Sequence, residues 1–257
     1  MAPRSIAIVG ASNNPTKMGT IQYLNLRHSG FPGPVYPIHP KETQIFGVEA
    51  YPRIEDLPEV PDLAMLVVPG HLVPDMIERF GALGTRHAVI ITAGFKETGQ
   101  EGVALEAALM EAARAHGLRF LGPNCMGLVN THLPLNVTAA PLISSPGALS
   151  IVSQSGTYIT QTLQYLHERG VRINKAVSVG NDTPPLGDPD DMLLLDSLSA
   201  QVAGEWYLLG QRAIVVEEIV DRWLAADGSH NVVIRTPTGM TLCGRALPWD
   251  PMRPLVE

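Results

Sequence analysis

The sequence contains few cysteines, few aromatic residues and no run of basic residues. Two cysteines among 257 residues are too few to form a disulfide framework. Phenylalanine, tryptophan and tyrosine make up only 5% of the chain, so we expect an aliphatic, alanine-rich core that suits α/β layers. The formal net charge of −7, with no basic tract, argues against nucleic acid as a partner.

Long apolar segments are absent as well. No stretch reaches the ~18–20 apolar residues that a membrane-spanning helix requires. The segment Met1–Arg4 is not followed by the apolar region of a signal peptide. We therefore predict a cytoplasmic protein with no membrane as a partner. An apolar content of 45% with 17% charged residues is typical of globular proteins, and 257 residues suffice for one large domain or two small ones.

The first half of the chain alternates between short apolar runs and segments with helical spacing. Strands are predicted over 5–10, 35–40, 63–68, 87–92 and 118–121. Helices are predicted over 17–29, with Met18, Ile21 and Leu24 on one face, after Pro69-Gly70, and over 101–116. This alternation predicts a doubly wound, Rossmann-like parallel sheet. A ligand of such a sheet binds at the carboxyl ends of its strands.

A second α/β unit is predicted further along the chain. Residues 131–147 lack periodicity and are rich in proline, serine and threonine, so we predict a linker there. It separates a first domain, 1–130, from a second, partial flavodoxin-like domain, 148–257. The latter has predicted strands over 148–152 and 176–179 and a helix over 157–169. After about residue 182 the pattern is irregular, with a helix over 213–225 and a strand over 231–235 as the best predictions.

The loop Gly10–Gly19 joins the first predicted strand to the first predicted helix. A tight glycine turn there can direct backbone N–H groups and the positive end of the helix dipole at an anion. The loop departs from the nicotinamide fingerprint, because Ser12 and Pro15 replace its second and third glycines. The second strand ends at His39-Pro40-Lys41 rather than at an acidic residue, which would repel a phosphorylated ribose. We predict a phosphate-binding turn, with a plain structural turn as the alternative.

Several loop motifs resemble, in the same order, the CoA-binding part of NDP-forming acyl-CoA synthetases. This family includes ADP-forming acetate–CoA ligases and the succinyl-CoA synthetase α subunit. One departure is His39, where the family usually has asparagine. The resemblance covers about residues 4–181 and rests on these segments: Ile8–Gly19, Val35–Lys41, Val67–Pro69, Ile91–Glu97, Gly122–Gly127, Ser153–Gly156 and Val177–Asn181.

The resemblance implies two groups of binding residues. The first would bind coenzyme A: Gly10, Ala11, Ser12, Pro15, Lys17, Gly19, His39, Lys41, Pro69, Ile91, Thr92 and Ala93. The second would lie near the thioester and a small carboxylic acid substrate: Asn124, Ser153, Gln154, Ser155, Gly156 and Thr157. For the turn at Ser153–Gly156, a purely structural role is the alternative. Cys125 has no neighbouring basic residue and is predicted to be a packed side chain.

The family reaction converts acyl-CoA, ADP and phosphate reversibly to acid, CoA and ATP, through an acyl phosphate and a phosphohistidine. The sequence contains no Ser-His-Thr-Gly-Ser-type segment to carry that phosphate, and no ATP-grasp portion. By resemblance, ADP, ATP and Mg would therefore be bound only by an ATP-grasp β-type partner, in an oligomer. No histidine spacing predicts a metal site. The alternatives are a non-catalytic module that binds CoA or acyl-CoA and, less favoured, an NAD(P)-dependent oxidoreductase.

Overall fold

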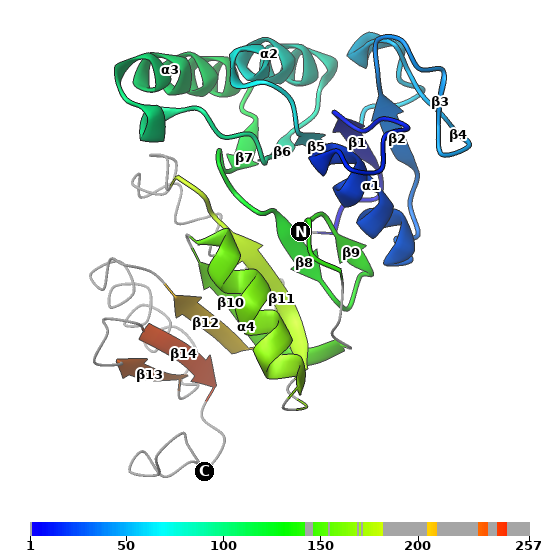
Figure 1. Cartoon of the computed structure of the whole chain (residues 1–257). Coiled ribbons are helices and arrows are strands. Elements are labelled where there is room, and N and C mark those ends of the chain that lie inside the picture. The colour runs from blue at the N-terminus through cyan, green and yellow to red at the C-terminus, as the bar shows by residue number, and fades with distance from the viewer. Residues whose placement is uncertain are drawn as a thin grey trace.

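The computed structural model describes residues 2–141, 146–153, 155–168, 170 and 172–181, together with three further strands. Its first sheet is five-stranded and parallel, in the order β2-β1-β5-β6-β7 (Figure 1). The strands are β1 (Ile6–Val9), β2 (Val35–Ile38), β5 (Leu63–Leu66), β6 (His87–Ile90) and β7 (Arg119–Leu121). The predicted doubly wound parallel sheet is thus confirmed.

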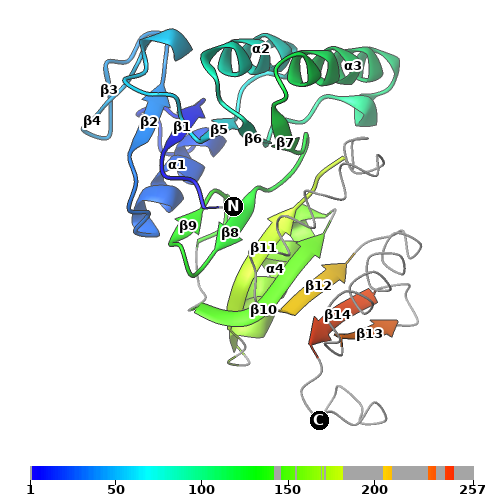
Figure 2. The ribbon, with the colours of Figure 1, turned by 180° about the vertical axis from the view of Figure 1, so that it is seen from behind.

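Helices cover both faces of this sheet. Helices α2 (Val73–Leu83) and α3 (Gln100–Ala115) lie side by side in both views (Figures 1 and 2). Their buried residues pack on one face of the sheet, and α1 (Met18–His28) packs on the other. A small hairpin of β3 (Gln44–Ile45) and β4 (Val48–Glu49) follows β2. Single turns of 3-10 helix lie at Ile54–Asp56, Gly70–Leu72 and Lys96–Thr98.

The buried face of α1 differs from the predicted one. Met18 is 48% exposed, whereas Tyr23 and Leu26 are fully buried. Small or polar residues also face inward in the first turns, including Gly19 and Thr20. The apolar spacing was a poor guide because the start of α1 packs against the backbone of the preceding loop, where no large side chain fits.

A second sheet is built from later strands in the order β12-β10-β11-β8-β9. These are β8 (Leu128–Asn130), β9 (Leu135–Asn136), β10 (Pro146–Ser153), β11 (Ile173–Ser178) and β12 (Glu205–Leu209), and α4 (Gly156–Glu168) packs on one face. Strand β10 runs parallel to β11 and β12, but β8 and β9 pair antiparallel. A separate antiparallel pair joins β13 (Asn231–Arg235) and β14 (Thr241–Arg245). The predicted strand over 231–235 is confirmed, whereas the predicted helix over 213–225 lies outside the described residues.

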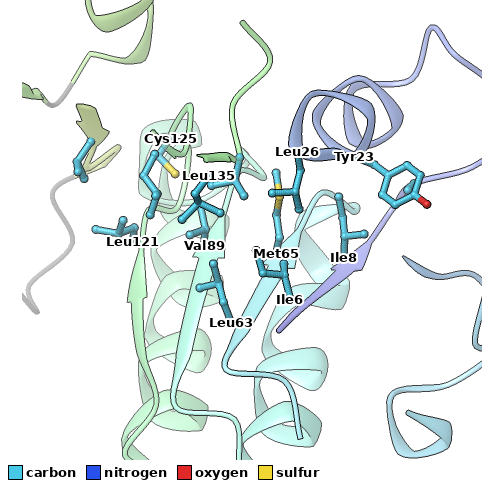
Figure 3. Close-up of a cluster of buried hydrophobic side chains, with 14 of the residues drawn as sticks. Ile6, Ile8, Tyr23, Leu26, Leu63, Met65, Val89, Leu121, Cys125 and Leu135 are labelled. Carbon is cyan, nitrogen blue, oxygen red and sulfur yellow. The ribbon is translucent and has the colours of Figure 1, made fainter. Parts of the chain in front are cut away.

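The segment 131–147, which we predict to be a linker, contributes to the core. It contains β9, and Leu135 and Val137 are fully buried. The cluster around them also includes Tyr23 and Leu26 of α1 (Figure 3). It extends to Val177 of β11. The Asn25 side-chain amide donates hydrogen bonds to the carbonyl oxygens of Thr138 (2.9 Å) and Ala140 (3.2 Å). Short strands of two or three residues have no periodicity by which the sequence could reveal them.

The division of the chain into domains stays a prediction. No helix within the described ranges combines the length and the apolar character needed to cross a membrane.

Candidate functional site

The site lies at the carboxyl edge of the first sheet, where β1 and β5 are neighbours. The chain leaves β1 and β5 toward opposite faces of the sheet, and ligands of open α/β sheets bind at such a switch point. Gly10 follows β1 with φ +108°, and a Cβ there would lie 2.0 Å from the carbonyl oxygen of Val67. A Cβ on Gly19 would lie 2.4 Å from the carbonyl oxygen of Gly10. The two glycines therefore let the loop, β5 and α1 approach each other closely. Ala11 is fully buried in the core.

Four backbone N–H groups of the loop bond to acceptors within the loop and α1. Ser12 donates its N–H to Oγ1 of Thr20 (3.0 Å), and Asn14 donates its N–H to Oγ of Ser12 (3.3 Å). The N–H of Thr16 bonds to Oδ1 of Asn14 (3.0 Å), and that of Lys17 bonds to the Asn14 carbonyl oxygen (3.3 Å). Pro15 has no N–H to offer. The donors for an anion therefore come mainly from the start of α1 rather than from the turn itself.

The start of α1 has the properties of an anion-binding helix end. Lys17 precedes the helix, no side chain caps it, and its first turn contains no acidic residue. The first N–H groups of a helix have no partners within the helix, and they form the positive end of its dipole. Lys17 and Pro15 are both exposed beside this end. A phosphate here would be bound by backbone N–H groups and by the Lys17 ammonium.

The loop after β2 brings to the site a carboxylate that no sequence motif indicates. Glu42 Oε2 accepts hydrogen bonds from the backbone N–H of Asn13 (2.9 Å) and from the Asn13 side-chain amide. His39 Nδ1 accepts from the N–H of Lys41 (3.2 Å) and of Glu42 (2.9 Å). It thus bonds to the backbone two and three residues on, as an asparagine oxygen could in a turn. We expected no acidic residue at this strand end, but the turn at His39 folds Glu42 back onto the loop.

Thr92 joins the ends of β5 and β6. Its hydroxyl donates to the carbonyl oxygen of Val68 (2.8 Å) and accepts from the Val68 N–H (3.2 Å). Its own carbonyl oxygen accepts from the N–H of Asn124 (2.8 Å). Thr92 is only 9% exposed, whereas Pro69 and Ala93 are exposed and Ile91 is half-buried. The hydroxyl of Thr92 therefore joins the segment after β6 to the segment after β5, and Pro69 and Ala93 are exposed beside it.

The residues predicted to lie near the thioester and the carboxylic acid substrate come together where the two sheets meet. A Cβ on Gly156 would lie 1.8 Å from Cγ of Met126, so the start of α4 packs on the Gly122–Gly127 loop. Ser153 is buried, and its Oγ accepts from the N–H of Ser155 (3.1 Å). Ser155 and Thr157 are exposed, as is Asn124. Gln154 lies outside the described residues. The turn is thus next to the Asn124 loop, as the resemblance implies.

A hydrogen-bonded chain that the sequence did not indicate continues from Asn124. Its side-chain amide donates to Oδ1 of Asn181 (3.0 Å), and the Asn181 amide donates to the carboxylate of Glu97. Glu97 also accepts from the N–H of Gly94 (2.5 Å). Burial raises the pKa of the Glu97 carboxyl, but these hydrogen bonds outweigh it and the net pKa is lowered. Glu97 and Asn181 are 84 residues apart, so no local pattern could reveal the contact.

Cys125 and the residue types that can bind metal ions are the remaining candidates for chemistry. Cys125 is buried, its thiol donates to the carbonyl oxygen of Ile90 (3.3 Å), and burial raises its pKa to about 12. The prediction that Cys125 is a packed side chain is therefore confirmed. Within the described ranges, no group of three or more histidine, cysteine, aspartate or glutamate side chains could hold a metal ion.

Residues 4–131 match the CoA binding domain family, and they form a CoA-binding domain of that family with a Rossmann-like fold. The chain is homologous to ADP-forming acetate–CoA ligases, including their α subunits. It is 41% identical over 179 residues to the Archaeoglobus fulgidus acetate–CoA ligase [ADP-forming] I. It is 40% identical over 180 residues to the α subunit of acetate–CoA ligase [ADP-forming] II from Pyrococcus furiosus.

These relatives are longer than this chain. The alignments cover 70% of this chain but 26% and 39% of the two ligases, respectively. Among solved structures, acetyl-coenzyme A synthetase 1 of Ca. Korarchaeum cryptofilum superposes with a TM-score of 0.76 at 36% identity. That match covers 85% of this chain and 47% of the synthetase. The same synthetase has also been solved in complex with phosphate and ADP.

Proposed function

We propose that this chain is the CoA-binding α-type subunit, or a fragment of it, of an NDP-forming acyl-CoA synthetase. Such an enzyme converts acyl-CoA, ADP and phosphate reversibly to acid, CoA and ATP. The nucleotide and Mg are bound by an ATP-grasp β-type partner. The observation that carries the proposal is the start of α1, which has neither a side-chain cap nor an acidic residue and lies against Gly10 at the switch point. The homology to ADP-forming ligases and their α subunits supports it.

The residues take the following roles in this proposal. The start of α1 and the side chain of Lys17 bind phosphates of CoA, and Lys41 and His39 line the adjoining strand end. The segment Ile91–Ala93 and Pro69 line the crevice. Asn124 and the turn Ser153–Thr157 lie at the thioester end, next to a small carboxylic acid substrate. The hydrogen bond from the Asn124 N–H to Thr92 supports this order, because it joins the second group of residues to the first.

A calorimetric titration tests the CoA site directly. We expect the full chain to bind CoA saturably, with dephospho-CoA as a weaker ligand because it lacks the 3′-phosphate. NADH serves as the control ligand, since Ser12 and Pro15 break the nicotinamide fingerprint. Saturable NADH binding, with no competition by CoA, would instead favour an oxidoreductase. A flat CoA titration of folded protein would refute the proposal.

A non-catalytic module that binds CoA or acyl-CoA is the second candidate. It is favoured by one observation, the lack of a Ser-His-Thr-Gly-Ser-type segment in the sequence. Incubation with labelled ATP and an ATP-grasp subunit tests the second candidate. From the missing segment, we expect no acid-labile phosphohistidine on this chain even though it binds CoA. A labelled histidine in this chain would exclude the non-catalytic module.

A further inference from the structure

We propose that Glu42 opposes phosphate binding at the Gly10–Gly19 loop, so that a phosphoryl group of the ligand must displace its carboxylate. This inference rests on the proposed function, because it concerns the same CoA site. It concerns a residue that neither the motifs nor the resemblance identified. In this view Glu42 sets how tightly the loop binds phosphate-bearing ligands.

The hydrogen bonds of the loop single out Asn13. The N–H groups of Ser12, Asn14, Thr16 and Lys17 all bond to acceptors in the loop or in α1. Asn13 is different, because its N–H bonds to Glu42, which lies beyond β2. Among these five N–H groups, that of Asn13 is therefore the one that a ligand could take without breaking the turn.

Glu42 is held in this position by more than one contact. The side-chain amide of Asn13 donates both to Glu42 and to the carbonyl oxygen of Gln44 (2.8 Å). Nε2 of His39 lies 3.8 Å from Oε1 of Glu42. The Glu42 side chain is 29% exposed, so its charge is only partly screened by water. Asn13 thus already binds an anionic group, and that group belongs to the protein itself.

A carboxylate and a phosphate compete for the same donor. A phosphoryl oxygen that accepts from the Asn13 N–H either replaces the Glu42 oxygen or lies in contact with it. In the second case, two negative charges repel each other at short range. Phosphate is compensated by Lys17 and the start of α1, which lie on the same loop. Glu42 therefore weakens, but does not abolish, phosphate binding.

The test compares Glu42→Gln with Glu49→Gln. The first substitution removes the charge but keeps an oxygen for the Asn13 N–H. The second removes one charge from the neighbouring hairpin, where Glu49 pairs with Gln44 across the strands. We expect Glu42→Gln to bind CoA about fivefold more tightly than Glu49→Gln. This factor corresponds to the repulsion energy between two unit charges about 4 Å apart in water. The gain should disappear in 1 M salt, where charges are screened within about 3 Å.

Two further ligands identify the phosphate that displaces Glu42. Dephospho-CoA lacks the 3′-phosphate, and 4′-phosphopantetheine lacks the whole nucleotide. A gain for CoA alone assigns the 3′-phosphate, and a gain for CoA and dephospho-CoA assigns the pyrophosphate. Equal or weaker CoA binding by Glu42→Gln, compared with Glu49→Gln, overturns the inference while leaving the CoA site intact. If the wild type and both variants fold but none binds CoA, both the inference and the proposed function fail. Thermal unfolding of each variant verifies that it is folded.

Discussion

Replacing Gly10 with alanine is expected to destabilise the protein more than any substitution of an exposed residue and to abolish CoA binding. Alanine at φ +108° is strained by about 1–2 kcal/mol. Its Cβ would also lie 2.0 Å from the Val67 carbonyl oxygen, so the loop or β5 must shift. Overpacking of this kind adds about 1–3 kcal/mol. We therefore expect a loss of about 2–5 kcal/mol in the free energy of unfolding, measured by urea denaturation.

Gly84→Ala is the matched control for this prediction. Gly84 ends α2 with φ +112°, but a Cβ there would meet only Val60, at 3.5 Å. The Gly84→Ala variant should lose only about 1–2 kcal/mol in the free energy of unfolding, from backbone strain alone. Its CoA affinity should remain unchanged. Equal losses for the two variants would contradict the importance of the contact between Gly10 and Val67.

Removing the charge of Lys17 is expected to change CoA affinity and stability in opposite directions. A hydrogen bond to a charged group contributes about 1.5–3 kcal/mol, so Lys17→Ala should weaken CoA binding by about tenfold or more. A cation at a helix start is unfavourable, so the free energy of unfolding should rise by up to about 1 kcal/mol. Calorimetry and urea denaturation of the same samples measure the two effects.

Arg119→Ala is the control for the loss of positive charge. Arg119 is exposed at the first residue of β7, which places it at the opposite edge of the sheet from the crevice. We expect its CoA affinity to equal that of the wild type at physiological salt, because charges separated by more than about 8 Å are screened there. Equal losses in Arg119→Ala and Lys17→Ala would mean that Lys17 acts only through net charge.

The first sheet could be predicted from the sequence because its strands are buried on both faces and each ends at a turn. The apolar run over 63–68 and the helix with Leu109 and Ala113 on one face are examples, and both are confirmed. The strands β8 and β9 were missed because each has at most three residues, and because β8 pairs with β11, which lies far along the chain. Period-2 alternation needs a longer strand before it becomes visible.

The site could be predicted only in part, for a similar reason. The Gly10–Gly19 loop and the Asn124 loop were found because glycines and strand ends mark them in the sequence. Glu42 and Glu97 were missed because their roles depend on hydrogen-bond partners that are 29 and 84 residues away. Neither acidic residue belongs to a spacing pattern that would distinguish it from a solvated surface charge.

The cluster that α1 shares with β8 and β9 has a consequence for how fragments of this protein should be cut. The CoA binding domain family match ends at residue 131, yet Leu135, Val137 and Val177 lie in the same buried cluster as Tyr23 and Leu26. Ending a fragment at 131 would uncover the side of α1 that faces away from its sheet and leave the Asn25 amide without its two carbonyl acceptors. The family match therefore ends before the residues that complete the buried cluster around α1.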